Sequence, residues 1–482
     1  MQDTTGYEKY RQLRIEDYLQ EDRLEAEGKA KVYSSPTMSE KEGDGARVSR
    51  ESEYVIPEIR EEDLLEEILS RDNLNEAYKK VMRNKGSHGV DGMTVEQLPA
   101  YLALHGEELR QSILTGTYKP QPVRRVEIPK PDGGGFRLLG IPTVVDRVIQ
   151  QAAAQVLTPI YERKFSESSF GYRPGRRAQQ AIEQSRKYIN EGYKWTVDID
   201  LEKYFDTVNQ DKLMRLVSQE VKDGQVISLI RKFLVSGVMI NGVVMETEEG
   251  FAQGGNISPL LSNIMLHELD RELEKRGLRF CRYADDCNIY VKSKKAAERV
   301  IKSITRFIEE DLKLKVNRKK SKVDRPWRFK FLGFSFYYSY QKGEYSVRVH
   351  EKSIKRFKAK LKTLTGRSKG ISMDDRLLKL KQSIQGWVNY FRFADMKTLA
   401  KNLDEWVRRR IRMVVWKSWK RVRTRFVSLQ KLGLDKQKAW EYANTRKGYW
   451  RISDSPILHR TLTNAILEKR GLVSISVIYS KR

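Results

Sequence analysis

The spacing of apolar residues divides the chain into a helical beginning, a mixed middle and a helical end. From Glu61 the pattern is helical, and we expect Asp72 or Asn73 to cap a helix there. Helical and strand patterns alternate from about 95 to 345. Helical periodicity then dominates residues 351–450. The pattern therefore predicts an α+β protein whose C-terminal part is helical.

Two short strand patterns carry acidic side chains. The first alternates apolar and polar residues and places Asp198 and Asp200 on one face of a strand. The second, residues 280–291, predicts a hairpin with Asp285 and Asp286 at its tip. Because an ionised carboxylate resists burial unless a cation offsets it, we expect a divalent metal such as Mg²⁺, which takes few protein carboxylates.

Composition and charge point to a polyanionic partner. The chain has 482 residues, 39% of them hydrophobic, and a formal net charge of +28. Residues 1–70 carry 10 basic and 19 acidic side chains, whereas residues 351–482 carry 34 basic and 10 acidic ones. This concentration of positive charge is typical of nucleic-acid binding, with a generally basic surface as the alternative. No apolar run approaches the length of a membrane span, so we expect a cytoplasmic protein with no membrane partner.

The motif Tyr283-Ala284-Asp285-Asp286 gains specificity when it is combined with Asp200, which an aromatic residue follows five positions later. Together these residues resemble the palm of reverse transcriptases, and the chain is similar to the proteins encoded by bacterial group II introns of the endonuclease-lacking, group IIC type. The resemblance implies a right-hand polymerase architecture with fingers, a palm built on an antiparallel sheet, and a helical thumb. It also implies an RNA-directed DNA polymerase that uses two Mg²⁺ ions, with Mn²⁺ as a substitute.

The resemblance assigns catalysis and metal binding to three carboxylates and one backbone carbonyl: Asp200, Asp285, Asp286 and Leu201. Asp198 shares the strand face of Asp200, but the fifth residue after it is Lys203, so we expect Asp198 to have a structural role. Contacts with the incoming deoxynucleoside triphosphate are assigned to Lys130, Arg137, Phe205, Gln253 and Lys320. Phe205 would crowd a nucleotide 2′-hydroxyl, with a purely core-packing aromatic as the alternative.

Further resemblances imply the contacts with primer and template. These are assigned to Tyr283, Gly254, Gly255, Phe331, Leu332, Gly333, Asn84, Lys85 and Gly86. The family usually has Pro before the Gln of the Gln-Gly-Gly segment, and this chain has Ala252. Since Pro fixes φ near about −65°, we expect a freer loop here.

The helical end resembles the thumb and maturase region of the same intron proteins, which bind their own intron RNA. The resemblance assigns RNA contacts to Trp387, Tyr390, Arg408, Arg409 and Arg410. A thumb that holds only primer and template is the alternative. We expect four regions along the chain: a mobile acidic extension at 1–60, fingers and palm at 61–345, the thumb and maturase domain at 346–425, and a basic DNA-binding region at 426–482.

These resemblances imply a protein that copies intron RNA into cDNA and assists splicing and retrohoming. Its expected partners are the RNA template and intron RNA, the DNA primer and target DNA, and deoxynucleoside triphosphates. Two alternatives stay open. One is a reverse transcriptase of a phage-defence or CRISPR system, against which the maturase-like block at 386–391 argues. The other is a splicing factor with an inactive palm, against which the intact carboxylates argue.

Overall fold

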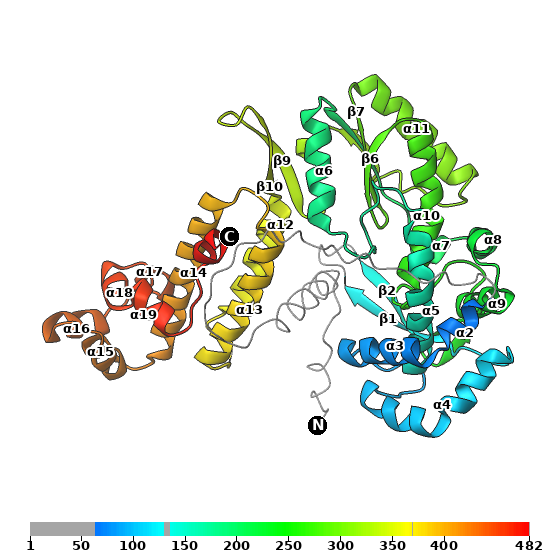
Figure 1. Cartoon of the computed structure of the whole chain (residues 1–482). Helices are drawn as coiled ribbons and strands as arrows, with labels where there is room; N and C mark the ends of the chain where they lie inside the picture. The colour runs from blue at the N-terminus through cyan, green and yellow to red at the C-terminus, as the bar shows by residue number, and fades with distance from the viewer. Residues whose placement is uncertain (1–62, 130–134, 369, 482) are drawn as a thin grey trace, which may run out of the picture. The chain divides into compact units, whose positions relative to one another are not determined.

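The computed structural model describes residues 63–129, 135–368 and 370–481, so the predicted extension at 1–60 and Lys130 lie outside the described residues. The described residues form two compact units. Unit 1 comprises those of 1–181 and 195–323, and unit 2 comprises those of 182–194 and 324–482. Helices and sheets are both present, which confirms the predicted α+β class (Figure 1).

Unit 1 consists of helices packed around two sheets (Figure 1). Its helical elements are α2 (Leu64–Ile68), α3 (Arg71–Asn84), η1 (Val95–Gln97), α4 (Leu98–Leu114), α5 (Val144–Glu162), α7 (Tyr204–Thr207), α8 (Gln210–Glu220), α9 (Gly224–Leu234), α10 (Ser258–Lys275) and α11 (Lys294–Glu310). A further helix, α6 (Ala178–Asn190), begins in unit 1 and continues in unit 2.

The cap of α3 differs from the expectation that Asp72 or Asn73 would fill this position. Ser70 is the N-cap, and its hydroxyl accepts a hydrogen bond from the Asn73 amide at 3.4 Å. The Asn73 side chain instead donates to the carbonyls of Ile68 and Ala152 at 2.9 and 3.1 Å. The predicted cap was therefore wrong, because Asn73 already ties α3 to α2 and α5.

The first sheet has the strand order β2-β1-β4-β5. Its strands are β1 (Val123–Pro129), β2 (Phe136–Ile141), β4 (Val238–Ile240) and β5 (Val243–Met245). Strand β1 is antiparallel to β2 and parallel to β4. This sheet lies in the region predicted to form the fingers.

The second sheet, which we call the palm sheet, has the order β6-β7-β3-β8. Its strands are β3 (Trp195–Ile199), β6 (Arg279–Tyr283), β7 (Asp286–Val291) and β8 (Lys322–Asp324). Strand β7 is antiparallel to both β6 and β3. Val197 and Ile199 are buried on the face that α11 covers, as their alternation predicts. Thr196 on the opposite face is only 1% exposed, so that face is also covered there.

Unit 2 combines a two-stranded sheet with helices. The elements are η2 (Pro326–Arg328), β9 (Phe334–Ser339), β10 (Glu344–Val349), α12 (Glu351–Leu364), α13 (Met373–Phe391), α14 (Lys397–Ser418), α15 (Val422–Lys431), α16 (Lys436–Ala443), α17 (Tyr449–Ile452), α18 (Pro456–Thr461), α19 (Asn464–Lys469) and α20 (Ile475–Ser480). The boundary predicted at 345 falls inside β10, and the regions 346–425 and 426–482 belong to one compact unit. Within the described ranges, no helix combines the length and apolarity that crossing a bilayer would require.

Candidate active site

Asp200 follows directly after β3, and the segment beyond α11 fixes the end of this strand. The Asp200 amide donates to Ser321 Oγ at 3.0 Å, and the Asp200 carbonyl accepts from the Asn317 amide at 2.8 Å. Leu201 forms a β-bridge with Val316. The backbone at Asp200 is therefore held from both sides.

The tight turn between β6 and β7 contains Asp285, and the third predicted carboxylate, Asp286, is the first residue of β7. Tyr283 and Asp286 pair across it, and Ala284 has a left-handed φ of 56°. Asp285 is half-buried, whereas Asp286 begins β7 and is exposed. Since Ile199 of β3 pairs with Cys287 of β7, Asp200 lies at the same end of the sheet as the turn.

Electrostatics connect the two strand ends. Burial is the main influence that raises the pKa of Asp285, and the negative charge of Asp200 raises this pKa further. The positive charges of Arg137 and Arg282 oppose this effect. Asp198, on the same strand face as Asp200, has a pKa raised to about 6, mainly by burial. The two carboxylates Asp200 and Asp285 therefore repel each other and favour a bound cation.

The donor chemistry at this position fits a hard divalent cation. Among the residues that the structure describes, no three His, Cys, Asp or Glu side chains gather closely enough to form a metal cage by themselves. Mg²⁺ needs only one or two protein carboxylates when waters and substrate phosphates complete its octahedron. Lys320 Nζ lies 3.5 Å from Asp200 Oδ2, which shows that this carboxylate attracts a cation. Asp200 and Asp285 are the residues that would hold the metal.

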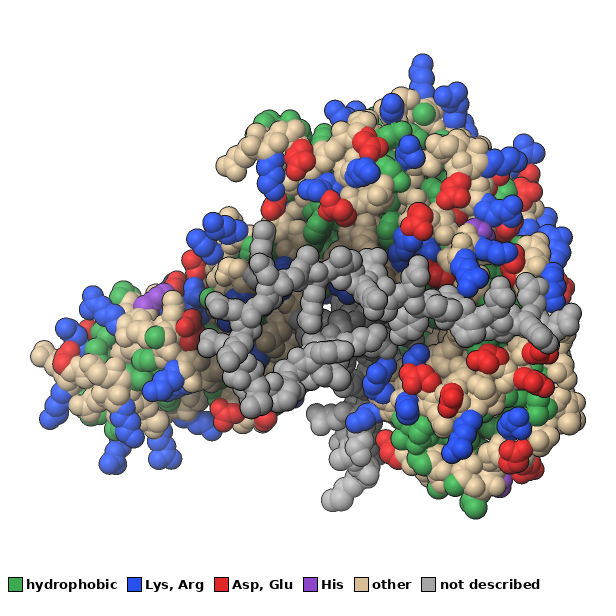
Figure 2. All heavy atoms as spheres, in the orientation of Figure 1, with side chains coloured by type: hydrophobic (Ala, Val, Ile, Leu, Met, Phe, Trp, Pro, Cys, Tyr) green, Lys and Arg blue, Asp and Glu red, His purple; other side chains and the backbone are tan. Residues whose placement is uncertain are grey.

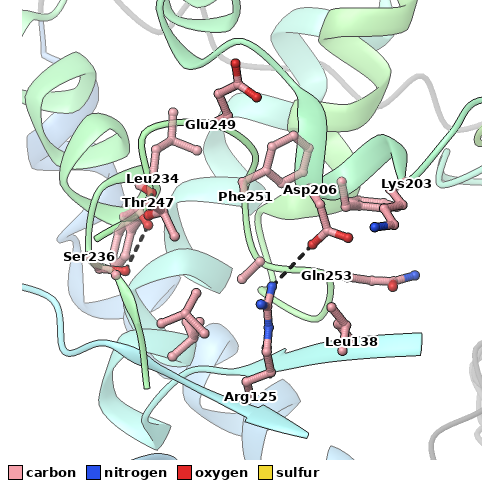
Figure 3. A pocket seen from close by; sticks show the side chains of 17 residues that line it. Arg125, Leu138, Lys203, Asp206, Leu234, Ser236, Thr247, Glu249, Phe251 and Gln253 are labelled. Atoms are coloured by element: carbon pink, nitrogen blue, oxygen red, sulfur yellow. Dashed lines mark hydrogen bonds and ion pairs between the residues drawn. The ribbon is translucent and has the colours of Figure 1, made fainter. Parts of the chain in front are cut away.

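A cavity of about 310 Å³ lies in unit 1, and the predicted nucleotide contact Gln253 lines it (Figure 3). Phe205, another predicted nucleotide contact, is also one of its lining residues. The ring of Phe205 also packs edge-to-face against Tyr204 and Phe251, with centroids 5.2 and 5.3 Å apart. Phe205 is therefore both a core aromatic and a wall of the cavity. Of the other predicted nucleotide contacts, Arg137 lies within electrostatic reach of Asp285.

The cavity also has charged walls that the sequence reasoning missed. Arg125 on β1 forms an ion pair with Asp206 at 3.4 Å, as the dashed line in Figure 3 marks. Lys203 lines the cavity as well and adopts a left-handed φ of 46°. Asp206 and Lys203 flank Phe205 by one and two positions, so their closeness to a predicted nucleotide contact was the available signal. No comparable sequence signal pointed to Arg125 on β1.

Two glycines of the predicted template contacts lie close to other parts of unit 1. Gly254 has a φ of +126°, and a Cβ there would lie 2.7 Å from the Gly140 carbonyl oxygen. A Cβ on Gly255 would lie 2.8 Å from Gln150 Oε1. Gly254 is therefore closed to larger side chains by the neighbouring backbone and by its own φ, whereas a larger residue at Gly255 would have to displace the side chain of Gln150.

The predicted template contacts at the end of α3 also lie in a close-packed place. Asn84 is the last residue of α3, and Lys85 follows with a left-handed φ of 45°. A Cβ on Gly86 would lie 2.6 Å from Arg147 Nη1. These residues belong to unit 1, as do Tyr283 and the Gln-Gly-Gly segment.

In unit 2, the segment predicted to contact primer and template is tied to α13, which carries two of the predicted RNA contacts. Phe331 is buried, and Leu332 and Gly333 both have positive φ, 48° and 87°. The Tyr390 hydroxyl donates to the Leu332 carbonyl at 2.9 Å. Trp387 stacks on a phenylalanine of α12 with a centroid distance of 4.2 Å. The structure thus gives Tyr390 and Trp387 packing roles within unit 2.

The three consecutive arginines of α14 lie in different environments. Arg410 is 9% exposed, and its guanidinium donates to Thr365 Oγ1 at 2.5 Å. Arg409 stacks over the Trp450 ring at 4.0 Å, whereas Arg408 is half-buried. Other Lys and Arg side chains project from the α15 and α16 end of unit 2 (Figure 2). The exposed positive charge of unit 2 therefore extends well beyond the three predicted arginines.

Comparison with known proteins adds two family matches. The model described as "Reverse transcriptase (RNA-dependent DNA polymerase)" matches residues 128–336, and the model described as "Group II intron, maturase-specific domain" matches residues 354–433. The first match contains Asp200 and the turn with Asp285, and the second contains α13 and α14. The predicted sites therefore lie within a matched family region, except for Asn84, Lys85 and Gly86, which precede the first match.

Individual relatives and a solved structure are also similar to parts of the chain. Protein YkfC of Escherichia coli K12 is 35% identical over 307 residues, which cover 55% of this chain and 80% of YkfC. The group II intron-encoded protein LtrA of Lactococcus lactis subsp. cremoris is 35% identical over 247 residues, 51% of this chain and 40% of LtrA. A solved structure titled "Partial Cas6-RT-Cas1--Cas2 complex" shares 23% identity at a TM-score of 0.34, over 52% of this chain and 43% of that chain. The chain thus spans less than half the length of LtrA.

Proposed function

The chain belongs to the reverse transcriptases that group II introns encode, and we propose that it extends a DNA primer along an RNA template at Asp200 and Asp285. The observation that carries this assignment is the meeting of these two carboxylates at one end of the palm sheet. Asp200 directly follows β3 and Asp285 directly precedes β7, and the pairing of these two strands places both residues at that end. A divalent cation held by both carboxylates would offset their mutual repulsion.

When bound, two Mg²⁺ ions would activate the primer 3′-hydroxyl and stabilise charge on the transferred phosphate. Asp200, Asp285 and the Leu201 carbonyl would hold them, and the exposed Asp286 would assist. Arg137 and Lys320 supply positive charge near the same carboxylates. Their contribution is to position the triphosphate and offset its charge.

The cavity beside Phe205 would accept the sugar of the incoming nucleotide. Its volume of about 310 Å³ lies at the small end of the range for ligand pockets. Phe205 is held by Tyr204 and Phe251, so its ring cannot move aside easily. A fixed ring at this position would exclude a 2′-hydroxyl and so favour deoxynucleotides.

We further propose that unit 2 binds intron RNA and thereby assists splicing and retrohoming. The maturase-specific match at 354–433 and the excess of Lys and Arg in residues 351–482 support this role. Each phosphate contact made by such a side chain releases counterions, so the binding should weaken steeply with salt.

Primer extension tests the proposed polymerase activity directly. The full-length chain is incubated with a DNA primer annealed to an RNA template, deoxynucleoside triphosphates and Mg²⁺. We expect full-length cDNA that disappears when EDTA chelates the metal. A folded preparation that binds the primer–template duplex but adds no nucleotide would refute the assignment. A parallel splicing assay tests the RNA-binding role separately. In it, we expect the protein to accelerate excision of the intron RNA from its flanking exons at low Mg²⁺.

A further inference from the structure

A buried arginine lies directly behind the turn that carries Asp285. Arg282 is on β6, and its side chain has no exposed surface. The Nε and Nη2 atoms donate to the two carboxylate oxygens of Asp270 on α10 at 2.7 and 2.5 Å, and Asp270 is likewise fully buried. The bidentate geometry fixes the plane of the guanidinium.

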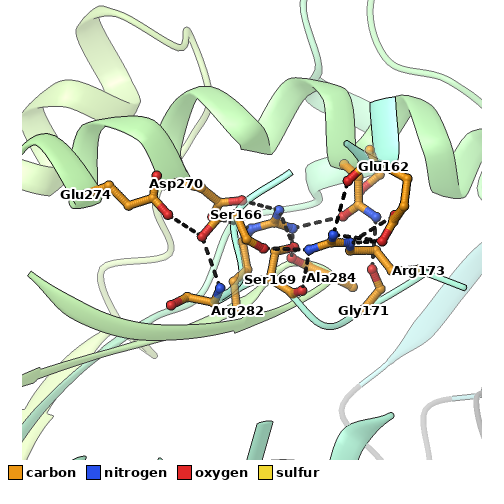
Figure 4. A network of polar contacts seen from close by, with 12 residues as sticks. Glu162, Ser166, Ser169, Gly171, Arg173, Asp270, Glu274, Arg282 and Ala284 are labelled. Carbon is orange, nitrogen blue, oxygen red and sulfur yellow. Dashed lines mark hydrogen bonds and ion pairs between the residues drawn. The ribbon is translucent and has the colours of Figure 1, made fainter. Parts of the chain in front are cut away.

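The remaining N–H groups of Arg282 reach three other partners (Figure 4). Nη2 also donates to Ser169 Oγ at 2.8 Å, and Nη1 donates to Asn263 Oδ1 at 3.0 Å and to the Ala284 carbonyl at 3.1 Å. All five N–H groups of this side chain therefore have an acceptor. One acceptor is the carbonyl of the residue immediately before Asp285.

The same turn is enclosed from a second side by the segment between α5 and α6. The Arg282 amide donates to the Ser168 carbonyl, and the Phe170 amide donates to the Arg282 carbonyl, each at 2.9 Å. A Cβ on Gly171 would lie only 2.2 Å from the Ala284 nitrogen. The Asn263 side chain, which accepts from Arg282, donates to the Gly171 carbonyl at 2.9 Å. The backbone before Asp285 thus has little room to move.

Stability alone does not account for this arrangement. A buried ion pair stabilises a fold no better than well-packed apolar residues of similar volume. Ala284, in contrast, holds a left-handed φ of 56°, a conformation that a residue with a side chain adopts only when its surroundings enforce it. The hydrogen bond from Arg282 to the Ala284 carbonyl is one such constraint.

We propose that Arg282, oriented by Asp270, is a positioning residue that holds the turn so that Asp285 faces Asp200 before any metal binds. This inference rests on the proposed role of Asp285 as a metal ligand. Loss of a group that orients a metal ligand typically lowers metal affinity or activity by about 10- to 100-fold. Loss of the guanidinium would loosen the turn and raise the Mg²⁺ concentration that DNA synthesis requires.

Two variants separate positioning from simple stabilisation. In the double variant Arg282→Met with Asp270→Leu, the charge pair is replaced by apolar side chains, which fill the space but leave the Ala284 carbonyl without its donor. In Arg282→Lys the charge is kept, but a single ammonium cannot reproduce the bidentate fork. The matched control is Asp223→Ala, since this buried aspartate caps α9 through hydrogen bonds to the Gln225 and Val226 amides. The control weakens unit 1 without touching the turn.

Hydrogen–deuterium exchange of the peptide spanning 280–290 is measured on the metal-free, full-length proteins, so it does not depend on activity. We expect amides of the turn to exchange at least about tenfold faster in both Arg282 variants and at the wild-type rate in Asp223→Ala. The Mg²⁺ concentration for half-maximal primer extension should rise about tenfold in the same two variants, while duplex binding is unchanged.

The double variant decides the question. If it folds and shows wild-type exchange and a wild-type Mg²⁺ requirement, the ion pair only fills the core and the inference is overturned. If it does not fold, the same two readouts on Arg282→Lys decide in its place. Failure of the proposed polymerase function would appear differently, as a wild-type protein without primer extension, and would leave the exchange comparison valid.

Discussion

Replacement of Asp198 tests the electrostatics of the palm sheet quantitatively. This residue lies two positions before Asp200 and directly opposite Asn288 on β7. Burial is the main cause that raises its pKa to about 6, and the charge of Asp200 adds to this effect while Lys322 opposes it. We expect Asp198→Asn to stabilise the metal-free protein at neutral pH and to change its stability little near pH 4, where the wild-type carboxyl is already neutral.

The sign and size follow from linkage. Because the pKa of Asp198 is higher in the folded chain than its ordinary value of 3.8, the folded state binds the proton more tightly. The resulting stabilisation is complete below the ordinary value and is lost as the pH rises through about 6. About two pKa units at about 1.4 kcal/mol each set an upper limit near 3 kcal/mol. The attraction of Lys322 is already contained in this pKa, and because an amide replaces a neutral carboxyl imperfectly, we expect a gain of about 1–3 kcal/mol.

Urea unfolding in EDTA, at about pH 4 and about pH 7.5, measures this difference. The control is Asp211→Asn, which removes the same charge from a carboxylate that is 79% exposed and paired with Arg231. We expect the control to change stability by less than about 1 kcal/mol at either pH. An Asp198→Asn gain of equal size at both pH values, or no gain at neutral pH, would refute the reasoning.

Three further outcomes are expected. Phe205→Ala should raise ribonucleotide incorporation in primer extension, and an unchanged preference for deoxynucleotides would leave the ring only its packing role. Gly171→Ala should destabilise unit 1 by about 1–3 kcal/mol in urea unfolding, because the added Cβ would overlap Ala284. The control Gly224→Ala should not, because its Cβ would meet open space. Equal effects of the two substitutions would contradict the close packing at Gly171. Arg421→Gln should reduce the salt slope of RNA binding by about one, and an identical slope would show that this exposed side chain makes no phosphate contact.

Local patterns predicted the elements of the palm well. The alternation before Asp200 indicated a strand, and the structure contains one at Trp195–Ile199. The predicted hairpin between residues 280 and 291 is also present, but its turn contains Ala284 and Asp285, and Asp286, which was expected at the tip, is already part of β7. Such features follow from residues that are close in sequence, since side-chain alternation and turn chemistry act over a few positions.

Contacts between distant segments could not be predicted in this way. Nothing in the sequence near Arg282 indicates that Ser169, 113 positions away, accepts one of its hydrogen bonds. The ion pair of Arg125 with Asp206 joins residues 81 positions apart. The family resemblance assigned an RNA contact to Arg410, yet its guanidinium donates to Thr365 within unit 2. These relations depend on tertiary packing, which periodicity does not encode.

The central claim is that Asp200 and Asp285 together hold the metal for RNA-directed DNA synthesis. Single-turnover addition of one deoxynucleotide to a DNA primer on an RNA template, compared between wild type, Asp200→Asn and Asp285→Asn at saturating Mg²⁺, tests it most directly. We expect each variant to lose at least about 1,000-fold in rate, since several kcal/mol of charge stabilisation disappear, while duplex affinity stays within about threefold of wild type. Nucleotide addition by either variant at a rate near that of wild type would contradict the account.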